Sequence, residues 1–424
     1  MLDIKFIREN KDLVQMGAKK KHIDFDVSAL LVLDDKRLSA LNQFETLKAE
    51  QNQITNLIAV EKDATKRMQM ITEMQAMKED VKKREEDLRE ATKEWQQMML
   101  LVPNIPDMTV PEGESDEQNA EVKTWGEIPK FDFEVKDHVA LVEDLDLADF
   151  ERGTKVAGFR GYFMKNEGAE LFFALWQFTL DYFVKAGYIP MIVPSMVNRE
   201  TLLGTGYLPQ AEDDLYKTQD DKYLAGTGEV ATMSYYAGET LDKSQLPKKI
   251  LAFSPCFRRE IGAHGKDVKG IIRVHEFFKL EQVILCEASH EESVKWHEEI
   301  TAHVENLMQA LKLPYHVVVN CGGDLGLGQV KKYDIEAWMP SQQKYRETHS
   351  SSYFHDFQTR RLNIRYKDTD GKVRYAHSLN NTACATSRLP AAILENYQQA
   401  DGTVKIPEVL QKYMGGKTVI TKKS

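Results

Sequence analysis

The chain has 424 residues, of which 42% are hydrophobic and 29% are charged, and its formal net charge is -10. This composition predicts a globular protein with two or three domains and a substantial core. It argues against a membrane protein, because no run of about eighteen apolar residues occurs. The mixed charges of the N-terminus are unlike a signal or transit peptide, so we expect a cytoplasmic protein. The acidic balance argues against nucleic-acid binding by the whole surface; such a partner would need local basic patches.

The cysteines suggest neither a disulfide framework nor a zinc site. They lie far apart in the sequence and form no CxxC pair: Cys256, Cys286, Cys321 and Cys384. Free cysteine packs as a small hydrophobic residue. We therefore expect these residues to be reduced and mostly buried.

A long helical hairpin is the first element that the sequence predicts. Apolar or tolerated residues recur in steps of four and three on both sides of a polar break, EKDATK: Ala40, Phe44, Leu47, Gln51, Ile54 and Ile58, then Met70, Met74, Met77, Val81, Arg84, Leu88, Ala91, Trp95, Met98 and Val102. This coiled-coil period predicts an antiparallel helix pair over about residues 36–100, each arm roughly 45 Å long and projecting from the body. Two ordinary helices in a globular core are the alternative, but charged and amide residues flank the seam.

A domain boundary is predicted after this hairpin. The segment Pro103 to Asn119 is rich in Pro, Gly, Ser and acidic residues. We therefore expect an N-terminal domain over residues 1–110 and a second domain over residues 111–424. The second domain mixes helical and strand patterns without regular βαβ alternation, which predicts an α+β fold with an antiparallel sheet.

Two apolar segments at the start of the second domain indicate an interface. Residues Gly168 to Tyr188 are apolar nearly all round, so we expect this helix to be buried on both sides. The following strand, IPMIVPSMV, is apolar on both faces and contains Pro190 and Pro194, which belong at sheet edges. An edge strand of this kind favours pairing with a partner chain. Burial inside one large domain is the alternative.

The stretch FRREIGAHGKDVKGIIRVHEFFKLEQV, Phe257 to Val283, predicts a β-hairpin with an unusually charged face. By strand alternation, one face carries Arg258, Glu260, Arg273, His275, Phe277, Lys279 and Glu281, and the core face carries Ile272, Val274, Phe278 and Leu280. Guanidinium groups clamp phosphate or carboxylate oxygens, and an aromatic ring stacks on a planar base. The loop has glycines for mobility and lysines for positive charge: Gly262, Gly265, Gly270, Lys266 and Lys269. Taken alone, the hairpin also fits a solvated charged face.

Two further segments favour a nucleotide site. In Leu379 to Gln398 a strand of small residues runs into an apolar helix, with Arg388 near the turn, where it can meet an anion. In YRETHSSS, Glu347 and Ser350 offer the hard oxygen ligands that Mg²⁺ prefers. Together they predict a site for a metal-bound polyphosphate. Since neither GxxxxGK[ST] nor GxGxxG occurs, ATP would lie across an antiparallel sheet.

These motifs resemble those of the class II aminoacyl-tRNA synthetases, over essentially the full length of the chain. GYIPMIVP is similar to the dimer-forming first motif, FRRE with RVHEFFKLE to the second, and LNNTACATSR to the third. The helical arm and GTGEV, Gly226 to Val230, narrow the resemblance to the seryl-tRNA synthetase family. It implies a ligase that activates L-serine with ATP and Mg²⁺ to seryl-adenylate and transfers the seryl group to the 3′ end of tRNA(Ser). It also implies that the N-terminal domain, residues 1–110, binds tRNA through its helical arm and that the catalytic domain is residues 111–424. It further implies a homodimer, and it makes tRNA(Sec) a second candidate substrate.

The resemblance also implies residue roles. Arg258 would hold the α-phosphate and the substrate carboxylate, and Arg258 and Arg388 would be the catalytic residues. The other ATP contacts would be Glu260 on the adenine amino group, Phe277 stacked on adenine beside Val274, and Arg273 and Arg388 on the β- and γ-phosphates. Glu347 and Ser350 would bind Mg²⁺. Serine would contact Thr227, Glu229, Arg258, Glu281, Asn380 and Thr382.

Two other protein classes fit part of the sequence. A coiled-coil tether would explain the arm but not the charged hairpin, and an amino-acid ligase acting on a carrier protein would be expected to lack the arm. His275 and His349 fit structural roles better than proton transfer. The cysteines are expected to be bystanders, because no covalent nucleophile is needed.

Overall fold

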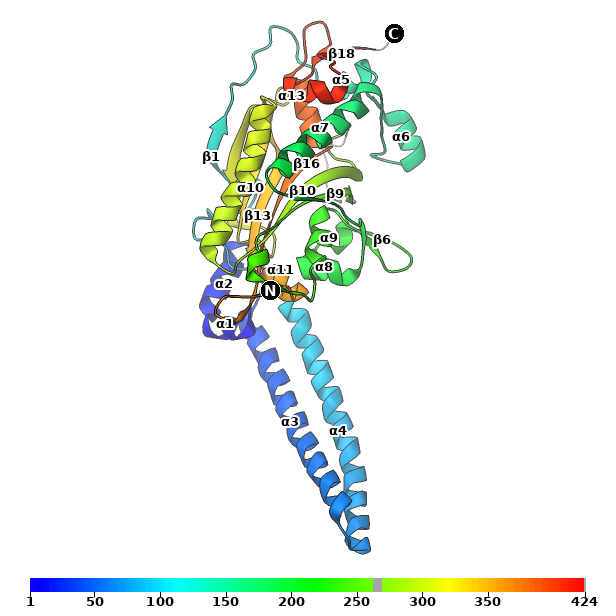
Figure 1. The fold of residues 1–424 in the computed structure, drawn as a ribbon, viewed down its shortest axis with the longest axis vertical. Helices are drawn as coiled ribbons and strands as arrows, with labels where there is room; N and C mark the ends of the chain where they lie inside the picture. Colours follow the sequence, from blue (N-terminus) through cyan, green and yellow to red (C-terminus); the bar gives the residue numbers. More distant parts are fainter. Residues whose placement is uncertain (262–268, 423–424) are drawn as a thin grey trace. The chain divides into compact units, whose positions relative to one another are not determined.

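A computed structural model describes residues 1–261 and 269–422 (Figure 1). Contacts divide the chain into an N-terminal unit, Leu2–Lys19 with Ile23–Pro103, and a second unit formed by Met1, Lys20–His22 and the chain from Asn104 onward. Three loop residues discussed above, Gly262, Gly265 and Lys266, lie outside the described residues. Within these ranges, no helix has both the length and the apolar character needed to span a membrane.

The N-terminal unit consists of helices, and two of them are long: α1 (Ile4–Glu9), α2 (Lys11–Lys20), α3 (Val27–Val60) and α4 (Ala64–Met99). An aspartate caps the start of each long helix. Asp26 accepts hydrogen bonds from the backbone N–H groups of Ser28 and Ala29, and Asp63 accepts them from Thr65 and Lys66. The turn between the long helices falls in the polar break. The predicted antiparallel helix pair is thereby confirmed.

The predicted seam of this helix pair is the side that is shielded from solvent. Its positions are buried or half-buried, whereas most residues between them are exposed; the exception is Arg84, whose side chain is 45% exposed. Polar contacts also join the two helices. The ammonium group of Lys36 lies 2.7 Å from the Glu94 carboxylate, and the guanidinium of Arg37 lies 4.6 Å from the centroid of the Trp95 ring. The seam therefore carries the apolar contacts of this arm.

An eight-stranded sheet forms the centre of the second unit, in the order β1-β11-β12-β13-β16-β10-β9-β4. Its strands are β1 (Ala120–Trp125), β4 (Ile189–Ile192), β9 (Lys248–Phe257), β10 (Glu276–Cys286), β11 (Tyr315–Val319), β12 (Lys331–Met339), β13 (Lys344–His355) and β16 (His377–Ala385). Neighbouring strands are antiparallel, except that β4 runs parallel to β9 at the edge. The predicted α+β class with an antiparallel sheet is confirmed.

Short strands form small sheets around this one: β2 (Ala148–Asp149) with β3 (Phe163–Met164); β5 (Met196–Val197), β6 (Tyr216–Lys217) and β7 (Tyr223–Leu224); β8 (Thr240–Asp242), β14 (Arg365–Lys367) and β15 (Val373–Tyr375); and β17 (Val404–Lys405) with β18 (Val419–Ile420). Helices of the unit are α5 (His138–Asp144), α6 (Phe150–Ala157), α7 (Asn166–Lys185), α8 (Arg199–Thr205), α9 (Gly228–Ser234), α10 (His290–Ala310), α11 (Phe357–Leu362), α12 (Arg388–Asn396) and α13 (Glu408–Gln411).

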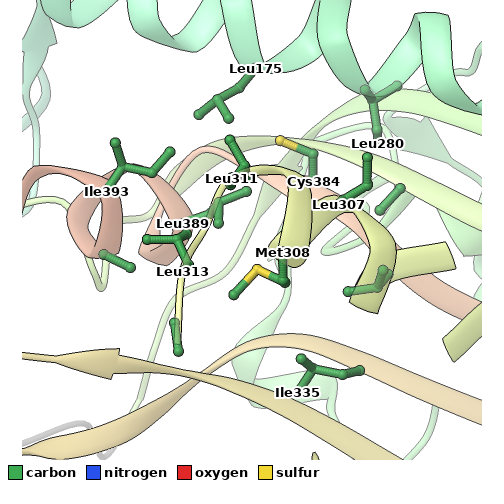
Figure 2. Close-up of a cluster of buried hydrophobic side chains, with 14 of the residues drawn as sticks. Leu175, Leu280, Leu307, Met308, Leu311, Leu313, Ile335, Cys384, Leu389 and Ile393 are labelled. Carbon is green, nitrogen blue, oxygen red and sulfur yellow. The ribbon is translucent and has the colours of Figure 1, made fainter. Parts of the chain in front are cut away.

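The main hydrophobic core lies on one face of the large sheet. Figure 2 shows side chains of α7, α10 and α12 meeting those of the strands, among them Leu175, Leu280, Leu307, Met308, Ile335, Cys384, Leu389 and Ile393. The cysteines are free and buried, as predicted. Helices α9 and α11 pack with the sheet through a separate apolar cluster that includes Met233, Val283 and Leu362. Successive strand residues point to opposite faces, so polar residues that alternate with core positions lie on the face away from α7 and α10.

The prediction that α7 is buried on both sides is wrong for this chain alone. Phe173 is 65% exposed and Val184 is 48% exposed on this helix. The adjacent β4 lies at the sheet edge, as its prolines predicted, and Ile189 and Ile192 are 50% and 87% exposed. An apolar groove lies between α7 and the β4 edge of the sheet, and Phe173, Trp176 and Ile192 are among its lining residues.

Candidate active site

Strand β10 carries the floor of the candidate site. Phe277, Lys279 and Glu281 alternate along it with the core residue Leu280, so they share the face away from the main core. Their cross-strand neighbours on β9 and β16 are mostly small: Ala252, Ser254, Cys256, Thr382 and Ala385. Small neighbours leave space above the sheet in which a ligand can lie.

The residues next to the loop of the predicted hairpin do not lie in strands. β9 ends at Phe257 and β10 begins at Glu276, so strand alternation does not place Arg258, Glu260 or Arg273. Val274, predicted on the core side opposite Phe277, is 2% exposed and packs in one small cluster with Phe277. Beyond the end of β9 at Phe257, Glu260 adopts a left-handed backbone conformation, with φ of 53°.

The residues expected to bind ATP nevertheless come together beside this floor. The guanidinium of Arg258 lies 5.4 Å from the centroid of the Phe277 ring, and its backbone N–H donates to the carbonyl of His275 at 3.0 Å. Arg273 and Glu260 form an ion pair of 2.9 Å. Aromatic, cationic and anionic groups therefore occupy one small region.

Arg388 and Glu347 form a second ion pair, although they come from different elements. Arg388 is the first residue of α12, and its Nη1 donates to both the carbonyl and a carboxylate oxygen of Glu347 at 2.9 Å. Burial would raise the pKa of Glu347, but Arg388, Lys332 and Arg258 outweigh it and lower that pKa. Glu347 is therefore ionised at neutral pH.

A β-bulge explains how Glu347 and Ser350 can serve one ligand. Residues three apart on a regular strand point to opposite faces, but the pairing of β12 with β13 shifts register between Ile335 and Glu336. Ser350 pairs across the strands with Asp334, whose Oδ2 accepts from Asn320 at 2.7 Å. The other oxygen of Asp334 has no hydrogen-bond partner among the described residues.

Glu347 and Ser350 carry oxygen atoms that are suitable ligands for a magnesium ion. No group of three or more His, Cys, Asp or Glu side chains in residues 1–261 and 269–422 could enclose a metal by itself. Mg²⁺, however, is commonly held by one or two protein oxygens, with phosphates and water completing its octahedron. An ionised Glu347 and the hydroxyl of Ser350 meet that requirement.

Glu229 is held rigidly in a second part of the site. Its carboxylate accepts hydrogen bonds from the Tyr207 hydroxyl at 2.9 Å and from the Gln358 amide at 2.6 Å. Thr227 caps α9, and its hydroxyl accepts from the backbone N–H of Glu229 at 3.3 Å. Burial raises the pKa of Glu229.

Glu281 lies close to Glu229, and the proximity of Glu281 also raises the pKa of Glu229. Glu281 is 2% exposed and pairs across the strands with Thr382. Burial raises the pKa of Glu281, although Lys279 and Arg258 oppose that shift. Asn380 lies two residues from Thr382 on β16, on the same face of the sheet.

Four neighbouring residues of the site were not assigned a role from the sequence: Tyr207, Lys279, Asp334 and Gln358. Of these four residues, the sequence could have indicated only Lys279, because it alternates along β10 with Phe277 and Glu281. The hydrogen bonds of Tyr207 and Gln358 to Glu229 join distant parts of the chain. His275 and His349 fit structural roles, since burial lowers the pKa of His275 and lowers that of His349 to about 4.

Comparison with known proteins shows the family of the chain. The family model for the seryl-tRNA synthetase N-terminal domain matches residues 1–106, and the model for the tRNA synthetase class II core domain (G, H, P, S and T) matches residues 212–397. The chain is 45% identical to the serine–tRNA ligase of Deinococcus radiodurans, over 99% of each chain. The chain belongs to the seryl-tRNA synthetase family.

This synthetase also has close structural relatives. The seryl-tRNA synthetase of Pyrococcus horikoshii complexed with ATP is 40% identical, with a TM-score of 0.91 over 100% of both chains. The cytoplasmic serine–tRNA ligase of Naegleria fowleri in complex with AMP is 32% identical, with a TM-score of 0.87 over 100% of this chain and 99% of that one. A prolyl-tRNA synthetase from Giardia lamblia, 16% identical with a TM-score of 0.57, covers 65% of this chain and 56% of its own and shares the fold. The chain is an ATP-dependent serine–tRNA ligase, as the resemblance implied.

Proposed function

We propose that this synthetase forms seryl-adenylate on the polar face of its sheet, with ATP beside Phe277 and serine beside Glu281. One observation supports this most: four carboxylates around that face each have a basic partner. The pairs are Glu260 with Arg273, Glu281 with Lys279, Asp334 with Lys332, and Glu347 with Arg388. Paired opposite charges suit two substrates that themselves carry both signs, a magnesium nucleotide and a zwitterionic amino acid.

The nucleotide would lie across the end of the β9–β10 hairpin. Adenine would stack on Phe277 beside Val274, with its amino group on Glu260. Its phosphates would meet three arginines: Arg258 at the α-phosphate, and Arg273 and Arg388 at the β- and γ-phosphates. To take these positions, ATP must replace the present partners of Arg273 and Arg388, which are carboxylates.

Adenylate formation then needs positioning and charge neutralisation. An oxygen of the serine carboxylate attacks the α-phosphorus in line, while Arg258 and Arg388 stabilise charge on the attacked and departing phosphates. Mg²⁺, held by Glu347 and Ser350, would supply further neutralisation of the phosphate oxygens when bound. No side chain acts as a nucleophile; burial raises the pKa of Cys286 and Cys384 to about 12, which keeps both thiols protonated.

Serine would be selected by groups that are already buried and oriented. Glu229 and Glu281 would accept from its ammonium and hydroxyl groups, and Thr227, Asn380 and Thr382 would complete the pocket. Because Tyr207 and Gln358 hold both oxygens of Glu229, that carboxylate is fixed before serine arrives. Preorganised polar groups of this kind discriminate strongly against an analogue that leaves them unpaired.

Pyrophosphate exchange against all twenty amino acids tests this proposal. We expect exchange that depends on ATP, Mg²⁺ and serine, followed by transfer to tRNA(Ser). Absence of serine-dependent exchange would contradict it. The same assay with tRNA(Sec) shows whether that second candidate is charged.

We also propose that the synthetase acts as a homodimer in the cytoplasm. Edge strand β4 and the outward side of α7 would form the interface, because their apolar side chains are exposed in one chain. Replacing Ile192, which is 87% exposed, by Glu should give a monomer in sedimentation experiments. The control is Val373→Glu on β15, which changes a residue that is 53% exposed elsewhere. A dimer that survives Ile192→Glu would exclude this surface.

A further inference from the structure

Lys279 is a buried cation on the floor of the site, and the family resemblance assigned it no role. It is 6% exposed, and its Nζ lies 2.5 Å from the Oε2 atom of Glu281, which is 2% exposed. A buried ion pair contributes little to stability compared with apolar residues of similar size. Stability alone therefore does not explain why Lys279 is charged.

The ammonium group has more donors than protein partners. Lysine carries three N–H donors, and among the residues that the structure describes the partner of this ammonium group is Glu281, with which it forms an ion pair. The cross-strand neighbours of Lys279 are Ser254 and Ala385, both small. The remaining donors of Lys279 are therefore available to a ligand above the floor.

Lys279 also lies between the two proposed substrate positions. Alternate residues on a strand are roughly 6.6 Å apart, so Lys279 is one such step from Phe277 and one from Glu281. With adenine on Phe277 and the serine ammonium and hydroxyl on Glu281, the serine carboxylate and the α-phosphate meet between these residues. The side chain of Lys279 lies on the same face of the sheet as both of them.

We propose that Lys279 is a further catalytic residue: one donor holds Glu281, and the others hold the oxygen of the serine carboxylate that does not attack ATP. This inference rests on the proposed positions of adenine and serine. Arg258 would then take the attacking side of the carboxylate and the α-phosphate. The two cations would fix the plane of the carboxylate for in-line attack.

The same contact serves both steps of the reaction. In the first, the attacking oxygen bonds to the α-phosphorus, and pyrophosphate leaves with the electrons of the broken P–O bond. In the second, the tRNA hydroxyl oxygen bonds to the carbonyl carbon, AMP leaves with the electrons of the broken C–O bond, and the hydroxyl proton passes to an AMP phosphate oxygen. Lys279 keeps its protons throughout and stabilises the charge that builds on the carbonyl oxygen.

Comparison of serine with serinamide tests this role. Serinamide keeps the ammonium and hydroxyl groups and lacks the carboxylate. Lys279→Gln keeps a donor for Glu281 and removes the charge, so we expect kcat/KM for serine in pyrophosphate exchange to fall about 10²-fold. The inhibition constant of serinamide should change only a few-fold. The matched control is Lys295→Gln on α10, whose side chain is 60% exposed, and it should change neither value.

Two outcomes would overturn the proposal. If the variant loses kcat/KM for serine and affinity for serinamide in parallel, Lys279 acts only through Glu281. If neither value changes, Lys279 does not contact the substrate. Should Lys279→Gln not fold, the double variant Lys279→Met/Glu281→Gln, which leaves no charge in the pair, is compared with Glu281→Gln. An additional loss for serine but not for serinamide supports the proposal, and equal losses contradict it. Failure of the proposed function would appear separately, as absence of serine-dependent exchange in the unaltered synthetase.

Discussion

Different kinds of contacts stabilise the helical arm and the large sheet of the second unit. In the arm, α3 and α4 bury a single seam whose positions follow one another along the sequence in steps of three and four. In the sheet, each floor residue depends on strands that are distant in the chain: Glu281 on β10 meets Ala252 on β9 and Thr382 on β16. The arm is therefore a local structure, whereas the site exists only when the whole second unit is folded. This difference predicts that the two can be impaired separately.

Removing the arm should have the largest effect on one reaction and little on the other. We expect that replacing Lys36 to Met98 with a short Gly/Ser linker lowers tRNA aminoacylation by orders of magnitude. Serine-dependent pyrophosphate exchange should stay within a few-fold of the unaltered value, because no proposed ATP or serine contact lies in this segment. Aminoacylation should fall because the arm is expected to bind tRNA by recognising the shape and backbone of the RNA.

Aminoacylation and exchange are measured on the same preparation, so that a folding defect would lower both. If the armless protein charged tRNA as well as the full chain, the arm would have to be a structural or partner-binding coiled coil. The arm and the sheet would then differ in how they are stabilised, but they would not have separate functions.

The reverse separation should follow from changes at the phosphates. Arg258→Ala and Arg388→Ala should each lower adenylate formation by at least about 10²-fold, because each removes a donor that stabilises charge in the transition state. Binding of tRNA should be little affected. Arg152→Ala on α6, where the side chain is 76% exposed, is the control. Near-normal exchange rates in both site variants would remove the phosphate assignment.

The same contrast decides how much could be predicted from the sequence. The arm was predictable almost residue by residue, since a seam such as Phe44, Leu47 and Ile54 is visible within one helix. The floor of the site was partly predictable from the alternation of Phe277, Lys279 and Glu281 along one strand. Alternation failed at Arg258 and Glu260, because both follow the end of β9 at Phe257.

Long-range contacts were out of reach of sequence patterns. The hydrogen bonds of Tyr207 and Gln358 to Glu229 join three separate segments of the chain, and none of these residues stands in a periodic pattern with the others. The bulge that lets Glu347 and Ser350 serve one ligand depends on the register with β12. The exposed side of α7 was not predicted, because apolar residues on both sides of a helix predict burial on both sides, whereas Phe173 is 65% exposed in this chain.

Changing one hydroxyl in the serine pocket should have a smaller effect, confined to selectivity. The unaltered synthetase should disfavour alanine by roughly 10⁴-fold, since alanine leaves buried polar groups unpaired. Thr382→Val keeps the shape of the pocket and removes one hydrogen-bonding group, so the preference for serine over alanine should fall about tenfold or more. Pyrophosphate exchange with each amino acid measures this ratio. A variant that separates serine from alanine as sharply as the unaltered enzyme would show that Thr382 does not contact the substrate hydroxyl.

Removing a single charge from the arm should have the smallest effect, and this effect should be seen mainly in the salt dependence of tRNA binding. Lys82 and Arg89 lie on exposed positions of α4, and the side chain of Arg89 is 74% exposed. Replacing either by Ala should weaken tRNA binding a few-fold and reduce the slope of log K against log salt by about one unit per lost phosphate contact. Serine-dependent exchange should not change. The control is Lys372→Ala in the second unit, whose side chain is 76% exposed. If the arm variants lost affinity with an unchanged salt slope, these residues would support the helix pair and would not contact phosphate, and the arm would bind tRNA through other positions.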